Sequence, residues 1–249
     1  MHTDWRTRRA RAVLAAVVCL AAAATVSAAV DPGAGMAPRT EFVPPPAGTY
    51  TLQKIQPVRD AVLLDETGRA RHLAALTSGK VTLLTFFYTD CADALGCPFA
   101  FGTLHGLRAR LLPRTGARDR VRFVSVSLDP TTDTPVVLAR YAGALANNRE
   151  FEWHFLTARY VSSLLPVLDD FGQDVSVELD AQRRPTRTLH HMLKMVLIDP
   201  HGTVREIYSL AFLQPEVIIN DVMTLLREAP SLNARNRAPL ARPILANDR

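Results

Sequence analysis

Two cysteines, Cys91 and Cys97, lie in the stretch FFYTDCADALGCPFAF, between an apolar run and the expected start of a helix. Five residues separate them, which is too many for the C-x-x-C redox motif. Pro98 favours a helix start, and the helix dipole lowers the pKa of a thiol at a helix N-terminus. We therefore expect Cys97 to ionise readily. The pair has three readings: a redox pair, a metal clamp and an inert structural disulfide.

Two adjacent histidines, His190 and His191, come directly before the apolar run MLKMVLID. This position lets one imidazole face the two sulfurs. Two thiolates and one imidazole suit copper, since thiolates favour Cu(I) and the imidazole lets Cu(II) bind as well, and zinc accepts the same ligands. The other histidines have no motif around them and are interpreted as ordinary surface or core residues: His2, His72, His105, His154 and His201.

Two acidic residues, Asp129 and Asp133, occur in the segment SLDPTTDTP. They are candidates for groups that support the site or dock a partner. The simpler interpretation is a strand end followed by a capped helix, with Asp133 or Thr134 as the N-cap before Pro135. We favour the simpler interpretation.

The elements that must position these residues alternate between strands and helices. Runs of β-branched and aromatic residues predict buried strands at 81–88, 121–129 and 151–157. Apolar residues at helical spacing predict helices between them, and Pro166 should kink or interrupt the third helix. A hairpin with the turn DPHG and a helix from Pro215 follow. This order predicts an α/β, thioredoxin-like fold with a central mixed β-sheet flanked by helices.

The charge of the chain gives no sign of a nucleic-acid partner. The 249 residues carry a formal net charge of +5, but residues 1–28 and 229–249 contribute +3 each, which leaves −1 for the body. A body of this charge has no basic stripe of the kind that binds nucleic acid. We therefore expect no nucleic-acid partner.

The N-terminus has the pattern of an export signal. Arginines precede an apolar segment, and small residues end at Ala28, so residues 1–28 predict a signal peptide or an N-terminal membrane anchor. Cys19 belongs to this segment. Residues 29–50 predict a Pro/Ala-rich linker, 51–228 the folded domain and 229–249 a flexible C-terminal tail. The body is then exported or periplasmic, and it is anchored to the inner membrane if the signal is retained. A disulfide can persist in such a compartment outside the cytoplasm.

Several blocks of the chain together resemble the SCO/SenC family of copper chaperones. They are FFYTDC, the Cys97-Pro98 pair, VSVSLDPTTDTP, FLTARYVSSLLPVLDDFG and HHMLKMVLIDPHG, spread over residues 50–228. The resemblance implies a thioredoxin-like fold and a copper ion held by Cys91, Cys97 and His191. It also implies two partners: a client cuproenzyme subunit, that of cytochrome c oxidase in particular, and a copper donor protein.

The chain departs from the family pattern in its cysteine loop. The family motif is C-P-x-x-C-P, whereas this loop has five intervening residues and Ala92 in place of the first proline. The two added residues lengthen the loop by up to about 7 Å of contour, and Gly96 helps it to bulge. The added residues mainly change the direction in which the thiol of Cys91 points.

Two hypotheses compete with copper delivery. The first is a thiol-disulfide oxidoreductase that acts on exported proteins without metal, with Cys91 and Cys97 as the catalytic redox pair. The second is a permanent disulfide in a domain that binds partners through another face. A c-type cytochrome is excluded because no C-x-x-C-H motif occurs.

Overall fold

The computed structural model describes residues 43–146 and 148–228. The predicted signal or anchor at 1–28, most of the predicted linker and the predicted tail at 229–249 lie outside these residues. The described end of the linker, residues 43–50, contacts the last helix, where the Gly48 amide donates to Thr224 Oγ1 at 2.8 Å. None of the helices in the described parts of the chain combines the length and apolarity needed to cross a membrane.

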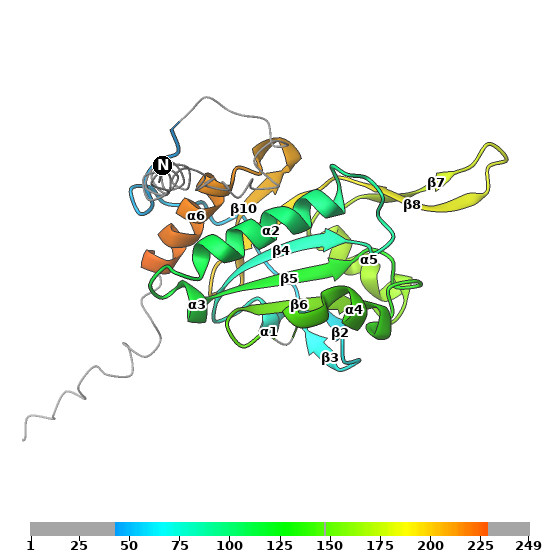
Figure 1. Ribbon diagram of the computed structural model, residues 1–249, viewed down its shortest axis with the longest axis horizontal. Helices are drawn as coiled ribbons and strands as arrows, with labels where there is room; N and C mark the ends of the chain where they lie inside the picture. Colours follow the sequence, from blue (N-terminus) through cyan, green and yellow to red (C-terminus); the bar gives the residue numbers. More distant parts are fainter. Residues whose placement is uncertain (1–42, 147, 229–249) are drawn as a thin grey trace, which may run out of the picture. The chain divides into compact units, whose positions relative to one another are not determined.

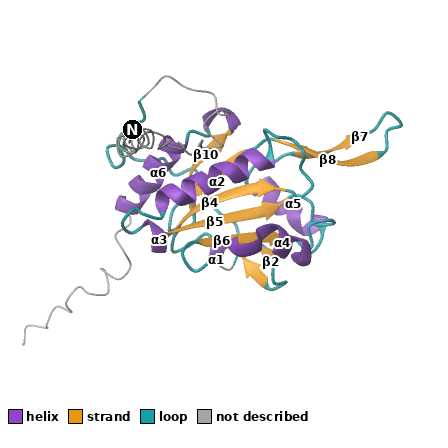
Figure 2. Cartoon of the chain, viewed as in Figure 1, coloured by secondary structure: helices purple, strands orange, loops and turns teal. Residues whose placement is uncertain are grey.

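An eight-stranded mixed sheet forms the centre of the fold, in the order β1-β10-β9-β4-β5-β6-β2-β3 (Figures 1 and 2). Three neighbouring strands run parallel, and β9 continues the sheet antiparallel to β4. The strands of this sheet are β1 (Gln56–Pro57), β2 (Val62–Asp65), β3 (Ala70–His72), β4 (Val81–Phe87), β5 (Val121–Ser127), β6 (Glu152–Thr157), β9 (Lys194–Ile198) and β10 (Thr203–Ser209).

The predicted central strands are confirmed. Their continuous apolar runs are buried on both faces of the sheet. Every residue of β4 and of β5 is buried. Helices cover both faces: α2 crosses in front of the sheet in Figure 1 and α5 lies behind it. The helices are α1 (Leu73–Leu76), α2 (Cys97–Leu111), α3 (Ala117–Arg120), α4 (Pro135–Ala142), α5 (Val161–Asp170) and α6 (Pro215–Glu228), with 3₁₀ turns η2 (Gly143–Leu145) and η3 (Leu210–Phe212). This mixed sheet with flanking helices is the predicted thioredoxin-like fold.

The helix α5 does not break at its proline. Pro166 lies inside the ten-residue helix, which runs from Val161 to Asp170 as one element. Of the two predicted outcomes, the interruption is therefore wrong, and the kink stays a prediction. Buried Leu164, Val167 and Leu168 anchor the helix to the core, so tertiary packing offsets the hydrogen bond that proline removes.

A second, two-stranded sheet was not predicted. Its strands β7 (Val175–Leu179) and β8 (Pro185–His191) form an antiparallel hairpin that projects from the body in Figures 1 and 2. Most residues of this hairpin are exposed, so it lacks the continuous apolar runs that marked the central strands. The alternation of apolar and polar residues in VSVEL is the signal that could have revealed it.

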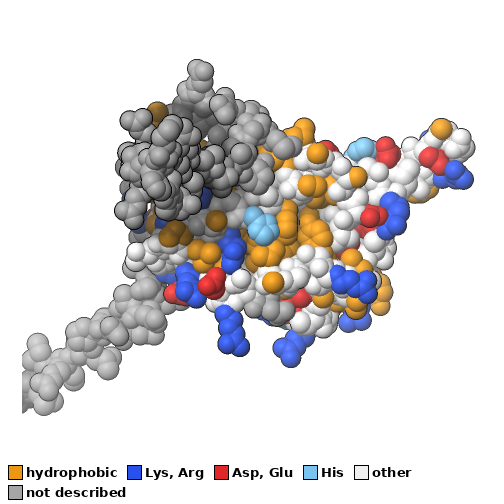
Figure 3. All heavy atoms as spheres, in the orientation of Figure 1, with side chains coloured by type: hydrophobic (Ala, Val, Ile, Leu, Met, Phe, Trp, Pro, Cys, Tyr) orange, Lys and Arg blue, Asp and Glu red, His pale blue; other side chains and the backbone are white. Residues whose placement is uncertain are grey.

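Charged side chains are spread over the face of the molecule shown in Figure 3. Lys and Arg side chains stand apart from one another there, and apolar side chains gather between them. Some charged groups of the described residues form ion pairs, such as Lys80 with Glu152 at 2.7 Å. This face therefore carries both charged side chains and apolar side chains.

Candidate thiol and metal site

The thiol of Cys97 lies at the start of helix α2, directly after the end of the loop from β4. Gly96 is the N-cap, Cys97 is the first helical residue, and Pro98 follows at a position where proline loses no hydrogen bond. The side chain of Cys97 is buried, with an exposed fraction of 3%. The helix start is therefore where the sequence predicts it, but the sulfur is out of solvent.

Burial is the main cause that raises the pKa of Cys97 to about 12; the nearby thiol of Cys91 acts in the same direction, and the backbone amides of Tyr88 and Cys97 act in the opposite direction. The expectation that the helix N-terminus would lower this pKa is wrong. The physical reason is that the free energy needed to remove a thiolate from water exceeds the stabilisation of the thiolate by the dipole of one helix. Cys97 is therefore a protonated thiol at neutral pH until a metal or a partner sulfur replaces the proton.

The thiol of Cys91 is partly buried and lies between Cys97 and Tyr88. It lies close enough to the thiol of Cys97 and to the hydroxyl of Tyr88 to raise the pKa of both groups. Both cysteines are free thiols. The lengthened loop thus brings the two sulfur groups close together.

The loop closes over Cys91 through a tight turn. The amide of Gly96 donates to the carbonyl of Asp93 at 2.9 Å, and the amide of Leu95 donates to Asp93 Oδ1 at 3.0 Å. A Cβ atom at position 96 would lie 3.2 Å from Cys91 Sγ and 3.2 Å from the Asp93 carbonyl oxygen. Glycine at this position therefore makes room for the sulfur of Cys91.

His191 is the imidazole that faces the thiols. Its Nε2 lies 3.8 Å from Cys97 Sγ, and its Nδ1 lies 3.3 Å from the carbonyl oxygen of Met192. Burial lowers the pKa of His191, and the Met192 carbonyl and the charge of Asp93 offset this only in part, so the ring is neutral at pH 7. The adjacent His190 is exposed. Strand alternation decides between the two, because successive side chains of β8 point to opposite faces.

Two contacts tie strand β8 to the cysteine loop. The amide of Leu189 donates to the hydroxyl of Tyr88 at 3.3 Å, and Arg187 forms an ion pair with Asp90 at 2.9 Å. The rings of Tyr88 and His191 meet edge to face with centroids 6.1 Å apart. The hairpin and the loop therefore hold the imidazole against the sulfur from both sides.

The site is not a closed metal cage. Within residues 43–146 and 148–228, no three side chains of His, Cys, Asp or Glu are grouped closely enough to hold a metal ion as they stand. Cys97 contacts His191 directly, and Cys91 lies near enough to Cys97 to raise its pKa. The donor types nevertheless fit copper, since two sulfurs and a neutral imidazole are ligands that it accepts.

Asp133 supports the start of the cysteine loop rather than capping a helix. Its side chain is fully buried and accepts hydrogen bonds from the Thr89 amide at 3.1 Å, the Thr89 hydroxyl and the Ser127 hydroxyl at 2.6 Å. Thr134 is the N-cap of α4, without a side-chain capping bond. The simpler interpretation is confirmed in its strand end, its helix and Thr134 as the N-cap, but Asp133 is not the cap. Its position two residues before Pro135 resembled a cap, and only the fold shows that the loop of Thr89 lies next to it.

Comparison with known proteins agrees with this architecture. The model of the family SCO1/SenC matches residues 53–227 of the chain. Apo Sco1 of Thermus thermophilus is similar at 26% identity, with a TM-score of 0.57 over 72% of this chain and 96% of that one. No curated protein sequence matches the chain at a significant level.

Two further solved structures share the fold. Bradyrhizobium japonicum ScoI with copper bound has 22% identity and a TM-score of 0.53, over 66% of this chain and 96% of that one. BsSco, described as a member of the Sco family of cytochrome c oxidase assembly proteins with a disulfide switch, has 23% identity and a TM-score of 0.52, over 71% and 98% of the two chains. At these identities the two likenesses show the fold.

Proposed function

Because the chain belongs to the SCO1/SenC family, we propose that it is an exported copper chaperone that binds copper through Cys91, Cys97 and His191. It delivers the metal to a respiratory copper centre such as that of cytochrome c oxidase, or maintains the thiols of that centre. The observation that carries the proposal is the contact of 3.8 Å between Cys97 Sγ and His191 Nε2.

Copper is cargo in this proposal, and the donors suit a cargo. Thiolates bind Cu(I) and the imidazole extends the set to Cu(II), so one site serves both oxidation states. The Nδ1 atom of His191 is held by the Met192 carbonyl, which fixes the tautomer and leaves the lone pair of Nε2 for a metal. Copper as the cargo is supported by a structurally similar protein, Bradyrhizobium japonicum ScoI, whose structure holds copper.

Binding by all three residues requires the loop of Cys91 to adjust. Both cysteines are free thiols, and a metal ion must displace the protons of both before it joins the sulfurs. Since burial raises the pKa of Cys97 to about 12, proton release accompanies copper uptake at neutral pH. Copper affinity therefore rises with pH.

The thiol pair also supports a second function, thiol-disulfide exchange without metal. The observation that favours it is the pair of free thiols, which lie close enough for Cys91 to raise the pKa of Cys97. Cys91 is the more accessible sulfur, so its thiolate attacks the disulfide of a substrate protein and forms a mixed disulfide with it, releasing one substrate thiolate. Cys97 then attacks Cys91, the mixed disulfide breaks, and the second substrate thiol leaves. The pair gives two electrons and becomes a disulfide.

A copper titration of the chain with reduced thiols tests the first function. We expect one copper per chain, a sulfur-to-Cu(II) charge-transfer absorption and, for His191→Ala, an affinity for Cu(II) lowered by about 10-fold or more. His190→Ala is the matched control, since it removes a neighbouring imidazole that is exposed. Copper binding that is absent, or equal in His191→Ala and the wild type, contradicts the proposal.

An insulin reduction assay on the same proteins separates the second function from the first. Exchange requires both sulfurs, so Cys91→Ser and Cys97→Ser should abolish it, whereas His191→Ala should retain it. Loss of reduction in His191→Ala would show that the imidazole is needed for the thiol chemistry and would contradict exchange independent of the metal site.

A further inference from the structure

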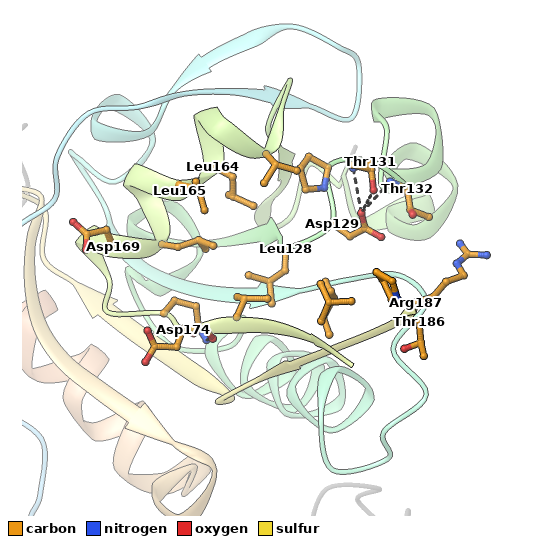
Figure 4. A pocket seen from close by; sticks show the side chains of 18 of the residues that line it. Leu128, Asp129, Thr131, Thr132, Leu164, Leu165, Asp169, Asp174, Thr186 and Arg187 are labelled. Carbon is orange, nitrogen blue, oxygen red and sulfur yellow. Dashed lines mark hydrogen bonds between the residues drawn. The ribbon is translucent and has the colours of Figure 1, made fainter. Parts of the chain in front are cut away.

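A groove with a volume of about 770 Å³ lies between α5, the β7–β8 hairpin and the turn that follows β5 (Figure 4). Leu128, Leu164 and Leu165 line its middle. The groove is separate from the thiols and the imidazole, since none of Cys91, Cys97 and His191 lines it. A groove of this size with an apolar middle has the character of a binding site.

The apolar side chains of this region are more exposed than folding alone explains. The exposed fraction is 56% for Leu165, 48% for Val161 and 47% for Val177, all of which line the groove. Tyr160 at 64% and Leu179 at 51% extend the same elements. A contiguous apolar patch on a folded domain indicates an interaction surface.

The charges of the groove are acidic. Asp129, Asp169 and Asp174 line it and make no ion pair with any residue that the structure describes. Its one arginine, Arg187, is already paired with Asp90. In Figure 4, Asp169 and Asp174 lie at one end and Asp129 lies toward the other, beside Thr131 and Thr132. Thr131 and Thr132 donate hydrogen bonds to Asp129, but none of the three carboxylates has a cationic partner among the described residues. Negative charges at both ends favour an occupant with positive charges on either side of an apolar centre.

Gln173 gives the groove a free hydrogen-bond acceptor. Its exposed fraction is 3%, and its Nε2 donates to the carbonyl oxygens of Asp174 at 3.2 Å and Met192 at 3.1 Å. These two bonds fix the orientation of the amide, and Oε1 has no partner among the described residues. An acceptor of this kind suits the N–H of an extended peptide backbone.

The groove lies along the strand that carries His191. Arg187 and Leu189 line it, and His191 follows them at intervals of two residues on strand β8, so the three share one face of the hairpin. Moreover, the Met192 carbonyl that accepts from Gln173 is also the partner of His191 Nδ1. A segment that fills the groove therefore lies along the strand that carries the imidazole.

We propose that this groove docks an extended peptide segment of the protein that exchanges copper with this chain, a segment with an apolar centre flanked by Lys or Arg. The inference rests on the proposed function, because strand β8 carries both residues that line the groove and the imidazole of the proposed copper site. The body of a second copy is a poor occupant, since residues 29–228 have a net charge of −1 and the groove is itself acidic.

Binding of two synthetic peptides to the full chain tests the groove. The first has a Leu-Pro-Val-Leu centre flanked on each side by two lysines, and the second has the same centre flanked by glutamates; each carries a fluorophore for anisotropy. We expect saturable binding of the lysine peptide, weakened by salt, and binding of the glutamate peptide that is about 10-fold weaker or absent.

Surface variants locate the binding. Leu165→Lys should weaken binding of the lysine peptide by about 10-fold, and Asp169→Asn with Asp174→Asn by about 5-fold. Val136→Lys is the matched control, because Val136 is 61% exposed on α4 and does not line the groove. Equal binding of the two peptides, or equal binding by Leu165→Lys and Val136→Lys, overturns the proposal. So does self-association of the chain that Leu165→Lys abolishes, since the occupant is then a second copy.

Copper titration of the same variants keeps the two proposals apart. Leu165→Lys should bind copper as the wild type does, since Leu165 lies outside the thiol and imidazole site. If the chain binds the lysine peptide but no copper, the groove proposal stands and the copper proposal fails. If the chain binds copper but not the peptide, the copper proposal stands and the groove proposal fails.

Discussion

The sulfur of Cys97 lies 3.8 Å from Nε2 of His191, although 94 positions separate the two residues in the chain. The sheet explains this proximity. Strand β4 pairs antiparallel with β9, with Thr85 opposite Met195, so the end of β4 and the start of β9 meet at one edge. The loop that follows β4 carries the thiols and the hairpin that precedes β9 carries the imidazole.

The two thiols should differ in reactivity. Burial raises the pKa of Cys97 to about 12 and its side chain is 3% exposed, whereas Cys91 is partly exposed. We expect iodoacetamide at about pH 8 to modify Cys91 at least about 10-fold faster than Cys97. Mass spectrometry of time points identifies the modified peptide. Faster modification of Cys97 would show that the helix N-terminus outweighs burial after all.

Gly96→Ala should weaken copper binding more than it weakens the fold. The added Cβ would lie 3.2 Å from Cys91 Sγ and would push the sulfur away from Cys97. We expect copper affinity to fall by about 10-fold, measured by competition with a chelator of known affinity. Gly102→Ala is the control: its Cβ would meet no atom within 4 Å, and alanine in helix α2 should stabilise the protein by up to about 1 kcal/mol. An unchanged affinity in Gly96→Ala would contradict the role of the glycine.

Asp133→Ala should destabilise the protein and loosen the cysteine loop. The variant leaves the Thr89 amide and the hydroxyls of Thr89 and Ser127 without their acceptor in a buried place. We expect the free energy of unfolding, measured with urea, to fall by about 2–4 kcal/mol, and Cys91 to react faster with iodoacetamide in the folded protein. For Asp119→Ala, on the exposed side of α3, the change should stay within about 0.5 kcal/mol. A similarly small effect in Asp133→Ala would refute the supporting role.

Glu152 should make the stability of the protein depend on acid pH. Burial raises its pKa, but hydrogen bonds with His154 and Lys80 and the charge of Arg122 outweigh burial and lower the pKa to about 2, from an ordinary value of 4.5. A pKa lowered in the folded state stabilises the protein above about pH 4.5, and this stability is lost as the pH falls toward 2.

Urea unfolding at about pH 6 and about pH 3 checks the dependence on Glu152. We expect Glu152→Gln to lose about 1–2 kcal/mol at the higher pH and less at the lower. Glu178→Gln, on the exposed hairpin, should change little at either pH. An effect of Glu152→Gln that is equal at both pH values would show that its charge is not the source of the stability.

Much of the fold could be predicted from the sequence, because the central strands are buried on both faces. Strands β4 and β5 therefore consist of continuous apolar runs, and Pro98 and Pro135 mark the starts of α2 and α4. Strands β1 to β3 and the hairpin of β7 and β8 escaped prediction, since they are short or exposed and their apolar residues alternate with polar ones.

The sequence by itself determined the family, the order of the central elements and the residue types of the site, since these depend on local pattern and spacing. Only the tertiary structure decided how the site residues interact. It placed His191, which the resemblance already implied, against Cys97 through the alternation of β8. It also buried Cys97 enough to reverse the expected direction of its pKa, and made Asp133 a support for Thr89 while Thr134 caps the helix. Each of these outcomes depends on contacts between residues far apart in the chain, and on the solvent that those contacts exclude.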